Sequence, residues 1–452
     1  MSIYREYSHR QQISRSDDPR QFLRAVAVRH DLPISPYLAA PSRSPSGFPV
    51  ASSATESIST EKVGVADDYK GCFAMEMDPS SALKSINASR LSAIVRKSLH
   101  RDTFQIQGWR VRRLDGGEGN PVSVGLYRFE GTGKERNEWI DWSIILKIIQ
   151  SPANVGLRNF GDGHDQSHWN YWKRELLVYQ SGLLETLPEG LVAPHCYEAI
   201  ELPGNVAGLW LEDITDSYGG GWTFDRYALA ARHLGRLNGS YISARPLPAF
   251  PWFSVQRAHQ WLTSVPWQAF PWEHPLVLEH YPRPMMNSFR RMLLDNERFL
   301  ARLDRLPKTV CHGDTYPTNL KSRRLKADHQ EQTVAMDWAL AGIEPLGDDL
   351  GQLVYGACMK LNGARLADVS QTLFESYLDG MADSGCRLDP SLVRFGYTAL
   401  AALRVGLYQL ILLGEELKQS NPIFKRSAQQ PAVNYPFEVA MADEAYELLD
   451  AI

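Results

Sequence analysis

Hydrophobic and polar residues alternate along two segments in the first half of the chain, at positions 104–111 and 122–129, and a nearly continuous apolar run follows at 142–149. A period of two is typical of strands, and the three segments together predict three consecutive antiparallel strands. Two further strands are expected at 194–202 and 207–214, and the apolar spacing at 169–179 predicts a helix before them. This region therefore predicts a sheet of five antiparallel strands with one helix.

The apolar positions change to helical spacing after residue 222. Thr223 is a plausible N-cap for a helix that ends near Ser243, because its hydroxyl can accept a hydrogen bond from the first turn. Further helices are predicted at 290–306, 351–361, 365–384, 391–416 and 434–449. The predicted fold is therefore α+β, in which a small antiparallel-sheet lobe is followed along the chain by a larger, mainly helical lobe.

The first 80 residues differ from the rest of the chain. Positions 38–61 are mostly Ser, Ala, Pro and Thr and lack the apolar periodicity that would bury a face. Residues 1–80 are therefore expected to form a flexible extension, and a helix at 79–100 is expected to lead into the first lobe. The predicted division then places the sheet lobe at 81–213 and the helical lobe at 214–452.

The composition is that of a chain able to bury a large core, since 44% of its 452 residues are hydrophobic and 22% are charged. A net charge of −4 argues against nonspecific binding to nucleic acid, which depends on a positive surface. The five cysteines are scattered and form no Cys-x-x-Cys pair, as in a reduced protein. The sequence has no run of about 18 apolar residues and no secretory signal. We therefore expect a cytoplasmic protein with no membrane or nucleic-acid partner.

Candidate chemistry lies in two short segments of the second half of the chain. Asp314 and Asn319 stand in the segment 311–320, and Asp337 follows eighteen residues after Asn319. One carboxylate can take a proton from an acceptor hydroxyl, while an amide and a second carboxylate can hold magnesium on a nucleotide. Such a set at this spacing indicates phosphoryl transfer.

The same segments resemble the aminoglycoside phosphotransferase family, the small-molecule branch of the protein-kinase-like fold. His312-Gly313-Asp314 followed by Asn319 is similar to that family's catalytic loop, in which Gly replaces the Arg of protein kinases. The segment around Asp337 is similar to the family's metal-binding segment. The resemblance implies that Asp314 is the catalytic base and that Asn319 and Asp337 are magnesium ligands.

Two further residues are expected to support this loop. Asp349 ends an acidic pair that resembles the family's acidic segment, whose last Asp braces the catalytic loop. His312 is expected to face inward and to hold the loop by packing and hydrogen bonding rather than to perform chemistry.

Lys147 stands inside the apolar run at 142–149. A buried lysine is costly unless it is paired, whereas an outward lysine on an edge strand needs no partner. The resemblance implies the first alternative, in which Lys147 grips the nucleotide phosphates and pairs with Glu175 in the helix at 169–179.

Two other contacts with the nucleotide are expected. Gly117 and Gly119 lie between the first two strands, where glycines let backbone amides approach phosphate oxygens, although such a loop can also be a simple hairpin turn. The strand at 207–214 resembles the family's hinge, so backbone groups near Glu212 and Ile214 are expected to hydrogen-bond the base. Contacts made by the main chain do not distinguish adenine from guanine.

The resemblance implies a phosphotransferase that uses ATP, or another nucleoside triphosphate, with Mg²⁺ and a small-molecule hydroxyl acceptor. Two alternatives are a nucleotide-binding regulator with weak or lost catalysis and a protein kinase. The presence of the full set of polar residues argues against the regulator, which would not need them for catalysis. The absence of the Arg before Asp314 and of the Phe-Gly after Asp337 argues against the protein kinase. A slight basic excess at 250–308 disfavours a polycationic aminoglycoside as acceptor. The sequence predicts neither the acceptor nor an oligomeric state.

Overall fold

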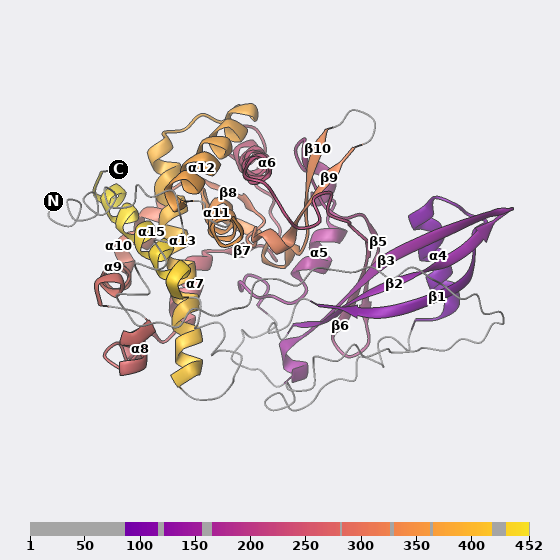
Figure 1. Ribbon diagram of the computed structural model, residues 1–452, viewed down its shortest axis with the longest axis horizontal. Coiled ribbons are helices and arrows are strands. Elements are labelled where there is room, and N and C mark those ends of the chain that lie inside the picture. The colour runs from indigo at the N-terminus through magenta and orange to yellow at the C-terminus, as the bar shows by residue number, and fades with distance from the viewer. Residues whose placement is uncertain are drawn as a thin grey trace, which may run out of the picture. The chain divides into compact units, whose positions relative to one another are not determined.

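The computed structural model describes seven segments of the chain, which all belong to one unit, Ser57–Ile452 (Figure 1). These segments are 86–115, 122–155, 165–280, 283–325, 330–361, 365–417 and 431–451. The predicted extension at 1–80 and the glycine-rich loop with Gly117 and Gly119 lie outside the described residues.

A five-stranded antiparallel sheet opens the described part of the chain (Figure 1). Its order is β1-β2-β3-β6-β5, with bounds β1 Gln105–Leu114, β2 Ser123–Glu135, β3 Glu138–Gln150, β6 Val206–Glu212 and β5 Cys196–Leu202. The prediction of five antiparallel strands is confirmed, and β2 and β3 extend well beyond their predicted bounds because they pair along a long hairpin.

The two faces of β3 pack against different helices. Ile144, Leu146 and Ile148 join the core beneath α4, Ala88–Leu99, whereas Ile145 and Ile149 join the core that contains α5, Arg174–Gln180. Because successive side chains alternate, this burial on both faces explains the nearly continuous apolar run in the sequence. The same alternation places Lys147 on the α5 side.

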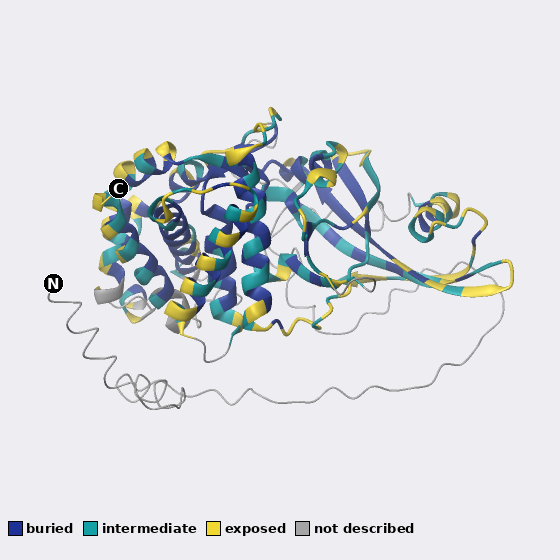
Figure 2. Ribbon diagram, turned by 90° about the horizontal axis from the view of Figure 1, so that it is seen from above, coloured by how far each residue is buried: buried dark blue, intermediate teal, exposed yellow. Residues whose placement is uncertain are grey.

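The helical part is built around α6, Phe224–Ser243, whose N-cap is Thr223 as predicted. It packs closely on α12, Leu366–Asp383, and a Cβ atom at Gly235 would lie 2.1 Å from the carbonyl oxygen of Tyr377. Glycine is needed here because the two backbones approach without room for a side chain. The remaining long helices are α11 Asp348–Lys360, α13 Pro390–Leu417 and α15 Pro431–Ala451, and Figure 2 shows buried positions concentrated inside this helical part.

Two small sheets carry the candidate loop segments. In one, β8, Lys308–Cys311, pairs antiparallel with β11, Gly342–Pro345, which also pairs with β7, Ser254–Val255. In the other, the hairpin of β9, Leu320–Arg324, and β10, Glu331–Ala335, lies beside β4, Leu191–Val192. The segment from His312 to Asn319 therefore starts at one sheet and ends at the other.

Three helix predictions are wrong in their bounds. The helix expected at 79–100 begins only at Ala88, because Asn87 is its N-cap, with an extended backbone and a side chain that accepts a hydrogen bond from the amide of Arg90. The helix expected at 169–179 begins only at Arg174, because the preceding residues form turns whose carbonyls accept hydrogen bonds from the Arg174 guanidinium. The helix expected at 290–306 is two helices, α9 Arg283–Leu294 and α10 Asn296–Arg305. They separate at Asp295, a residue type favoured at helix N-caps, whose carboxylate accepts a hydrogen bond from Tyr446.

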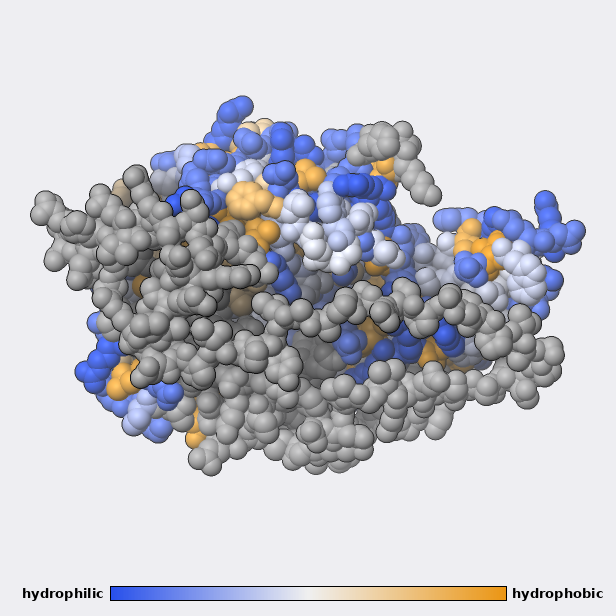
Figure 3. Space-filling model, in the orientation of Figure 1, coloured by the Kyte–Doolittle hydropathy of each residue, from blue (hydrophilic) through white to orange (hydrophobic). Residues whose placement is uncertain are grey.

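The shorter helices α7, Arg257–Ser264, and α8, Pro275–His280, lie in the tryptophan-rich region. Within α13, Pro390–Gly414 is long and apolar enough to cross a membrane, but 83% of its most apolar window is buried inside the protein. It is therefore a buried helix of the helical part. On the face drawn in Figure 3, the described surface is mainly hydrophilic with small separate hydrophobic areas.

Candidate active site

The segment after β8 makes a sharp turn at Gly313, whose φ is +80°. A Cβ atom there would lie 2.3 Å from the carbonyl oxygen of Leu340 and 2.6 Å from the guanidinium of Arg257. Both the left-handed backbone and the lack of space require glycine at this position. The turn brings Asp314 out of the core to the surface of the loop, where its side chain is 30% exposed.

Asp349, at the start of α11, holds the beginning of this loop. Its carboxylate accepts hydrogen bonds from the backbone amides of His312 at 3.1 Å and Gly313 at 2.8 Å, and from the side-chain amide of Asn238 at 3.2 Å. Asp349 is completely buried, so these donors replace the water that its charge would otherwise need. Asp349 therefore holds the start of the loop in place, as predicted for the brace of the loop.

His312 connects the loop with the segment that contains Asp337. Its Nε2 lies 2.9 Å from the carbonyl oxygen of Met336, and its Nδ1 lies 3.1 Å from the backbone nitrogen of Asp314. A carbonyl can only accept and an amide can only donate, so Nε2 carries the proton and the ring is neutral. Burial lowers the pKa of His312, in agreement with a neutral ring. The contacts support the loop, and the ring also packs on Trp338 with its centroid 4.5 Å away.

Asp314 and Asn319 lie in direct contact. The Asn319 Nδ2 donates to Oδ2 of Asp314 at 2.9 Å and to the Asp314 carbonyl at 3.0 Å. This orientation leaves the Oδ1 of Asn319 free to bind a cation, since no hydrogen-bond donor reaches it among the residues that the structure describes. The carbonyl of Asn319 accepts from the amide of Met336 at 2.8 Å, so the residue before Asp337 is fixed to the loop.

Lys147 joins the sheet, α5 and the Asp337 segment. Its Nζ lies 2.5 Å from Oε2 of Glu175 and 2.9 Å from Oδ1 of Asp337. The predicted pairing of Lys147 with Glu175 is thus present, and the alternative of an outward lysine on an edge strand is wrong, because β3 is an inner strand and Lys147 is buried.

The charges of this group depend on one another. Burial alone would lower the pKa of Lys147, but the charges of Asp337 and Glu175 hold it above its ordinary value. Burial raises the pKa of Glu175 to about 7 although Lys147 opposes the shift. Burial would also raise the pKa of Asp337, but the charge of Lys147 holds it below its usual range. The lysine therefore carries its charge in the folded protein.

Asp337 has a left-handed backbone, with φ 60° and ψ 68°. Non-glycine residues in this region are uncommon and concentrate at functional sites. Its side chain is 41% exposed while that of Lys147 is only 9% exposed, so a ligand can reach the carboxylate. Asn319 and Asp337 offer oxygen atoms from adjacent segments, and oxygen is the ligand type that Mg²⁺ requires. The donor atoms of these two residues are therefore of the kind that Mg²⁺ binds.

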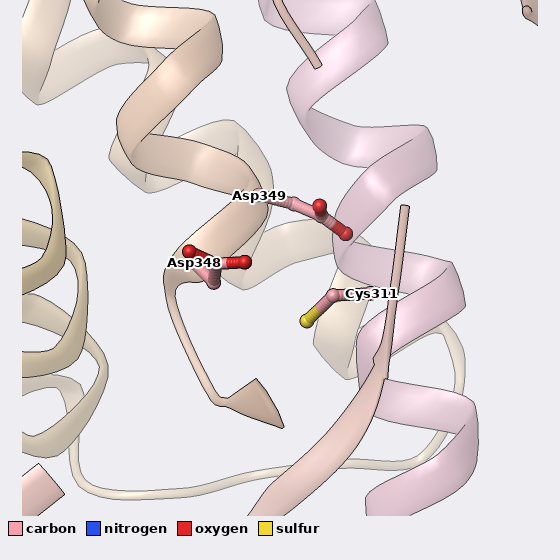
Figure 4. A group of neighbouring side chains, drawn as sticks. All are labelled: Cys311, Asp348 and Asp349. Atoms are coloured by element: carbon pink, nitrogen blue, oxygen red, sulfur yellow. The ribbon is translucent and has the colours of Figure 1, made fainter. Parts of the chain in front are cut away.

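A second group of possible metal ligands, Cys311, Asp348 and Asp349, lies beneath the loop (Figure 4). Its carboxylates already have partners, since Asp348 accepts from Arg257 at 2.8 Å and Asp349 holds the loop amides. Burial raises the pKa of the Cys311 thiol well above its usual value, which keeps it protonated. This group therefore supports the loop rather than a metal, and Cys311 is a buried residue at the end of β8.

The hinge prediction concerns the end of β6. The backbone amide of Glu212 donates to the carbonyl of His195 at 2.8 Å, and its carboxylate pairs with Arg323 at 2.7 Å. The backbone of Ile214 has no hydrogen-bond partner in the part of the chain that the structure describes. Contact of these residues with the base stays a prediction.

Three buried arginines around the loop were not found from the sequence. Arg174 donates to the carbonyls of Trp252 and Ala339, and Arg257 donates to Asp348 and to the carbonyl of Leu340. Arg404, from α13, donates to Asp314 and Gly313. For Arg404 the available signal was an arginine inside the apolar helix α13, because a charge in an apolar helix requires a partner just as Lys147 does. Arg174 and Arg257 are the first residues of their helices and gave no such signal.

The similarities of the chain to known proteins are found among solved structures. No family model matches the chain, and no curated protein matches it. Among solved structures, it is similar to the amicoumacin kinase hAmiN in complex with AMP-PNP, Ca²⁺ and amicoumacin, with a TM-score of 0.44 and 16% identity over 80% of this chain and 96% of that one. It is also similar to the spectinomycin phosphotransferase APH(9)-Ia in complex with ADP and spectinomycin, with a TM-score of 0.43 and 11% identity over 80% and 99% of the two chains.

A third similar structure is the choline kinase LicA from Streptococcus pneumoniae, with a TM-score of 0.40 and 15% identity over 80% of this chain and 99% of that one. The names of these three proteins describe kinases or phosphotransferases of small molecules. The structure of this chain has the predicted order of elements, an antiparallel sheet followed by a mainly helical part.

Proposed function

We propose that the protein is an ATP-dependent phosphotransferase that moves the γ-phosphate of ATP, or of another nucleoside triphosphate, to a hydroxyl of a small molecule. The observation that carries the proposal is the position of Lys147, whose ammonium joins Glu175 and Asp337. A charged lysine, a carboxylate partner on a helix and a metal-binding carboxylate are the parts that phosphoryl transfer by a kinase requires.

Each residue has a distinct role in this proposal. Lys147 offers positive charge to the phosphates, and Glu175 holds it in place. Asn319 and Asp337 would bind Mg²⁺, which when bound neutralises charge on the phosphate oxygens. Asp314 orients the acceptor hydroxyl toward the γ-phosphorus and accepts its proton.

The remaining contacts hold these groups in register. His312 and Asp349 fix the loop, and the Asn319 amide holds the Asp314 carboxylate at 2.9 Å. The division into a nucleotide-binding lobe at 81–213 and a catalytic and acceptor-binding lobe at 214–452 belongs to the proposal, as does a cytoplasmic location. Contacts of Gly117 and Gly119 with phosphate and of Glu212 and Ile214 with the base complete it.

Replacement of the proposed base tests the proposal directly. Asp314→Ala should lower kcat roughly 10²- to 10⁴-fold, the usual contribution of a general base, and leave the Kd for the Mg²⁺-nucleotide complex nearly unchanged. ATP consumption is measured against a library of hydroxyl compounds, and nucleotide binding is measured by calorimetry. Asp368→Ala, at an exposed pair with Arg365 on α12, is the control. Unchanged turnover in Asp314→Ala would refute the assignment.

The two alternative functions give different results in the same system. A nucleotide-binding regulator would bind nucleotide but consume no ATP with any acceptor. A protein kinase would transfer labelled phosphate to a peptide library. Both alternatives are less well supported, because Asp314 and the Lys147 group are present together and the motifs of protein kinases are incomplete.

A further inference from the structure

Arg404 reaches the candidate catalytic loop from α13, a helix that follows the loop by some 90 residues in the sequence. Its Nη1 donates to the carbonyl of Gly313 at 2.6 Å, and its Nη2 donates to Oδ1 of Asp314 at 2.9 Å. The planar guanidinium thus binds the backbone of the turn and the side chain of the next residue at the same time. A lysine has a single nitrogen and cannot reproduce this geometry.

The surroundings of Arg404 fix its position. Its side chain is 19% exposed, and the guanidinium lies over the ring of Trp261, 5.1 Å from the centroid. Gln352, on α11, is close to both groups, and in the amide orientation that satisfies its neighbours it donates to Oδ1 of Asp314 at 3.1 Å and accepts from Arg404. A guanidinium packed in this way can adopt few other orientations.

The two oxygens of Asp314 are therefore held from opposite sides. Asn319 donates to Oδ2, while Arg404 and Gln352 reach Oδ1. We propose that Arg404 is a positioning residue, which fixes the plane of the Asp314 carboxylate so that it meets the acceptor hydroxyl in line with the γ-phosphorus. The inference rests on the proposed function. A misplacement of about 1 Å in a reacting group can lower a rate roughly 10²-fold, so the effect should be found in kcat.

The chain contains a closely matched control on the same helix. Arg394 pairs with Glu444 at 2.5 Å, with side chains that are 17% and 30% exposed, whereas Arg404 and Asp314 are 19% and 30% exposed. Arg394→Gln and Arg404→Gln therefore remove equally buried ion pairs from α13. A purely structural role of Arg404 predicts the same result for both variants.

The kinetic test compares Arg404→Gln, Arg404→Lys and Arg394→Gln. Arg404→Gln should lower kcat about 10²-fold with the nucleotide Kd within about twofold of wild type, Arg404→Lys should restore part of the loss, and Arg394→Gln should keep kcat. Millimolar guanidinium should also raise the turnover of Arg404→Ala but not that of Asp314→Ala. Equal losses of kcat in Arg404→Gln and Arg394→Gln would overturn the proposal.

A second measurement does not depend on turnover. Hydrogen exchange of the loop 312–319, followed by mass spectrometry on the full chain, should accelerate at least tenfold in Arg404→Gln and stay unchanged in Arg394→Gln. If the wild type consumes no ATP but the loop responds in this way, the proposed function fails and the positioning contact stands. If the loop exchanges as in wild type, the positioning role is wrong even if the protein is a kinase.

Discussion

At the scale of single residues, the site is organised by charges that burial forces into pairs. Lys147 is 7% exposed and Arg257 is 1% exposed, so neither can rely on water for its solvation. Each meets a carboxylate from a distant segment, Asp337 for the lysine and Asp348 for the arginine. Buried ion pairs of this kind fix the relative positions of side chains more dependably than they stabilise the folded protein.

Glu344 provides a pH-dependent test of this organisation. It lies buried on β11, where it accepts from Ser254 and from the amide of Arg257, and burial raises its pKa from 4.5 to about 7. A raised pKa in the folded state means that the stability contributed by the protonated acid is complete below about pH 4.5 and is lost as the pH rises toward about 7. The free energy of unfolding should therefore fall by on the order of 3 kcal/mol between about pH 4.5 and about pH 7.

The glutamine side chain introduced by Glu344→Gln has no proton to lose. The free energy of unfolding of this variant should therefore rise relative to that of wild type between pH 5 and pH 8. Chemical denaturation at several pH values measures the free energy of unfolding, and the exposed Glu201→Gln serves as the control. A difference between Glu344→Gln and wild type that does not change with pH, or that changes in the opposite direction, would contradict this account.

At the scale of elements, the contact between α6 and α12 positions the support beneath the loop. Asn238 on α6 donates to Asp349, and Tyr377 on α12 donates to Asn238 at 2.6 Å. This chain of hydrogen bonds depends on the close approach of the two helices at Gly235. The packing of two helices is thus connected to the geometry of the loop.

Gly235→Ala should therefore destabilise the protein, by about 1–3 kcal/mol, because the new methyl group would meet the carbonyl of Tyr377. Gly414→Ala is the matched control, since it also lies in a helix but a Cβ atom there would meet nothing within 4 Å. It should stabilise the protein by about 0.5–1 kcal/mol. Thermal unfolding of both variants measures the effect, and an equal response at the two positions would contradict the packing argument.

The elements differ in how well the sequence predicts them. The strands were found because their side chains alternate over several residues, and α6 was found because Thr223 begins a regular apolar stripe. The start of α5 was missed because apolar residues before Arg174 occur at helical spacing, whereas their carbonyls bind its guanidinium. At the break between α9 and α10, Asp295 binds Tyr446, a contact that no local pattern reveals.

At the scale of the whole molecule, contacts of the loop and the sheet join five predicted site residues into one connected group: Lys147, Glu175, Asp314, Asn319 and Asp337. Motif spacing could predict these residues because they lie in segments with a recognisable order. Arg404 and Gln352 could not be predicted, because their contacts with Asp314 arise only when α11 and α13 pack beside the loop.

The charges around Asp314 also limit the acceptor. Asp348 and Asp349 already have donors, and Arg404 lies directly beside Asp314, so the described site offers a cation little free negative charge. We therefore expect neutral or anionic hydroxyl compounds to be better acceptors than cationic ones. Matched pairs such as glucose and glucosamine, or cyclitols and aminocyclitols, would measure this as kcat/KM, with at least a tenfold preference for the uncharged member. Consistent preference for the amino member would contradict it.

The neutral ring of His312 has a consequence for behaviour in acid. Its Nδ1 lone pair binds the amide of Asp314, so a proton that arrives at this nitrogen must displace that amide. Since burial holds the pKa of His312 below 6.5, the contact contributes fully above about pH 6.5 and is lost as the pH falls through the lower folded value. Acidification would then weaken the turn at Gly313 from within, because the protonated ring can no longer accept from the amide of Asp314.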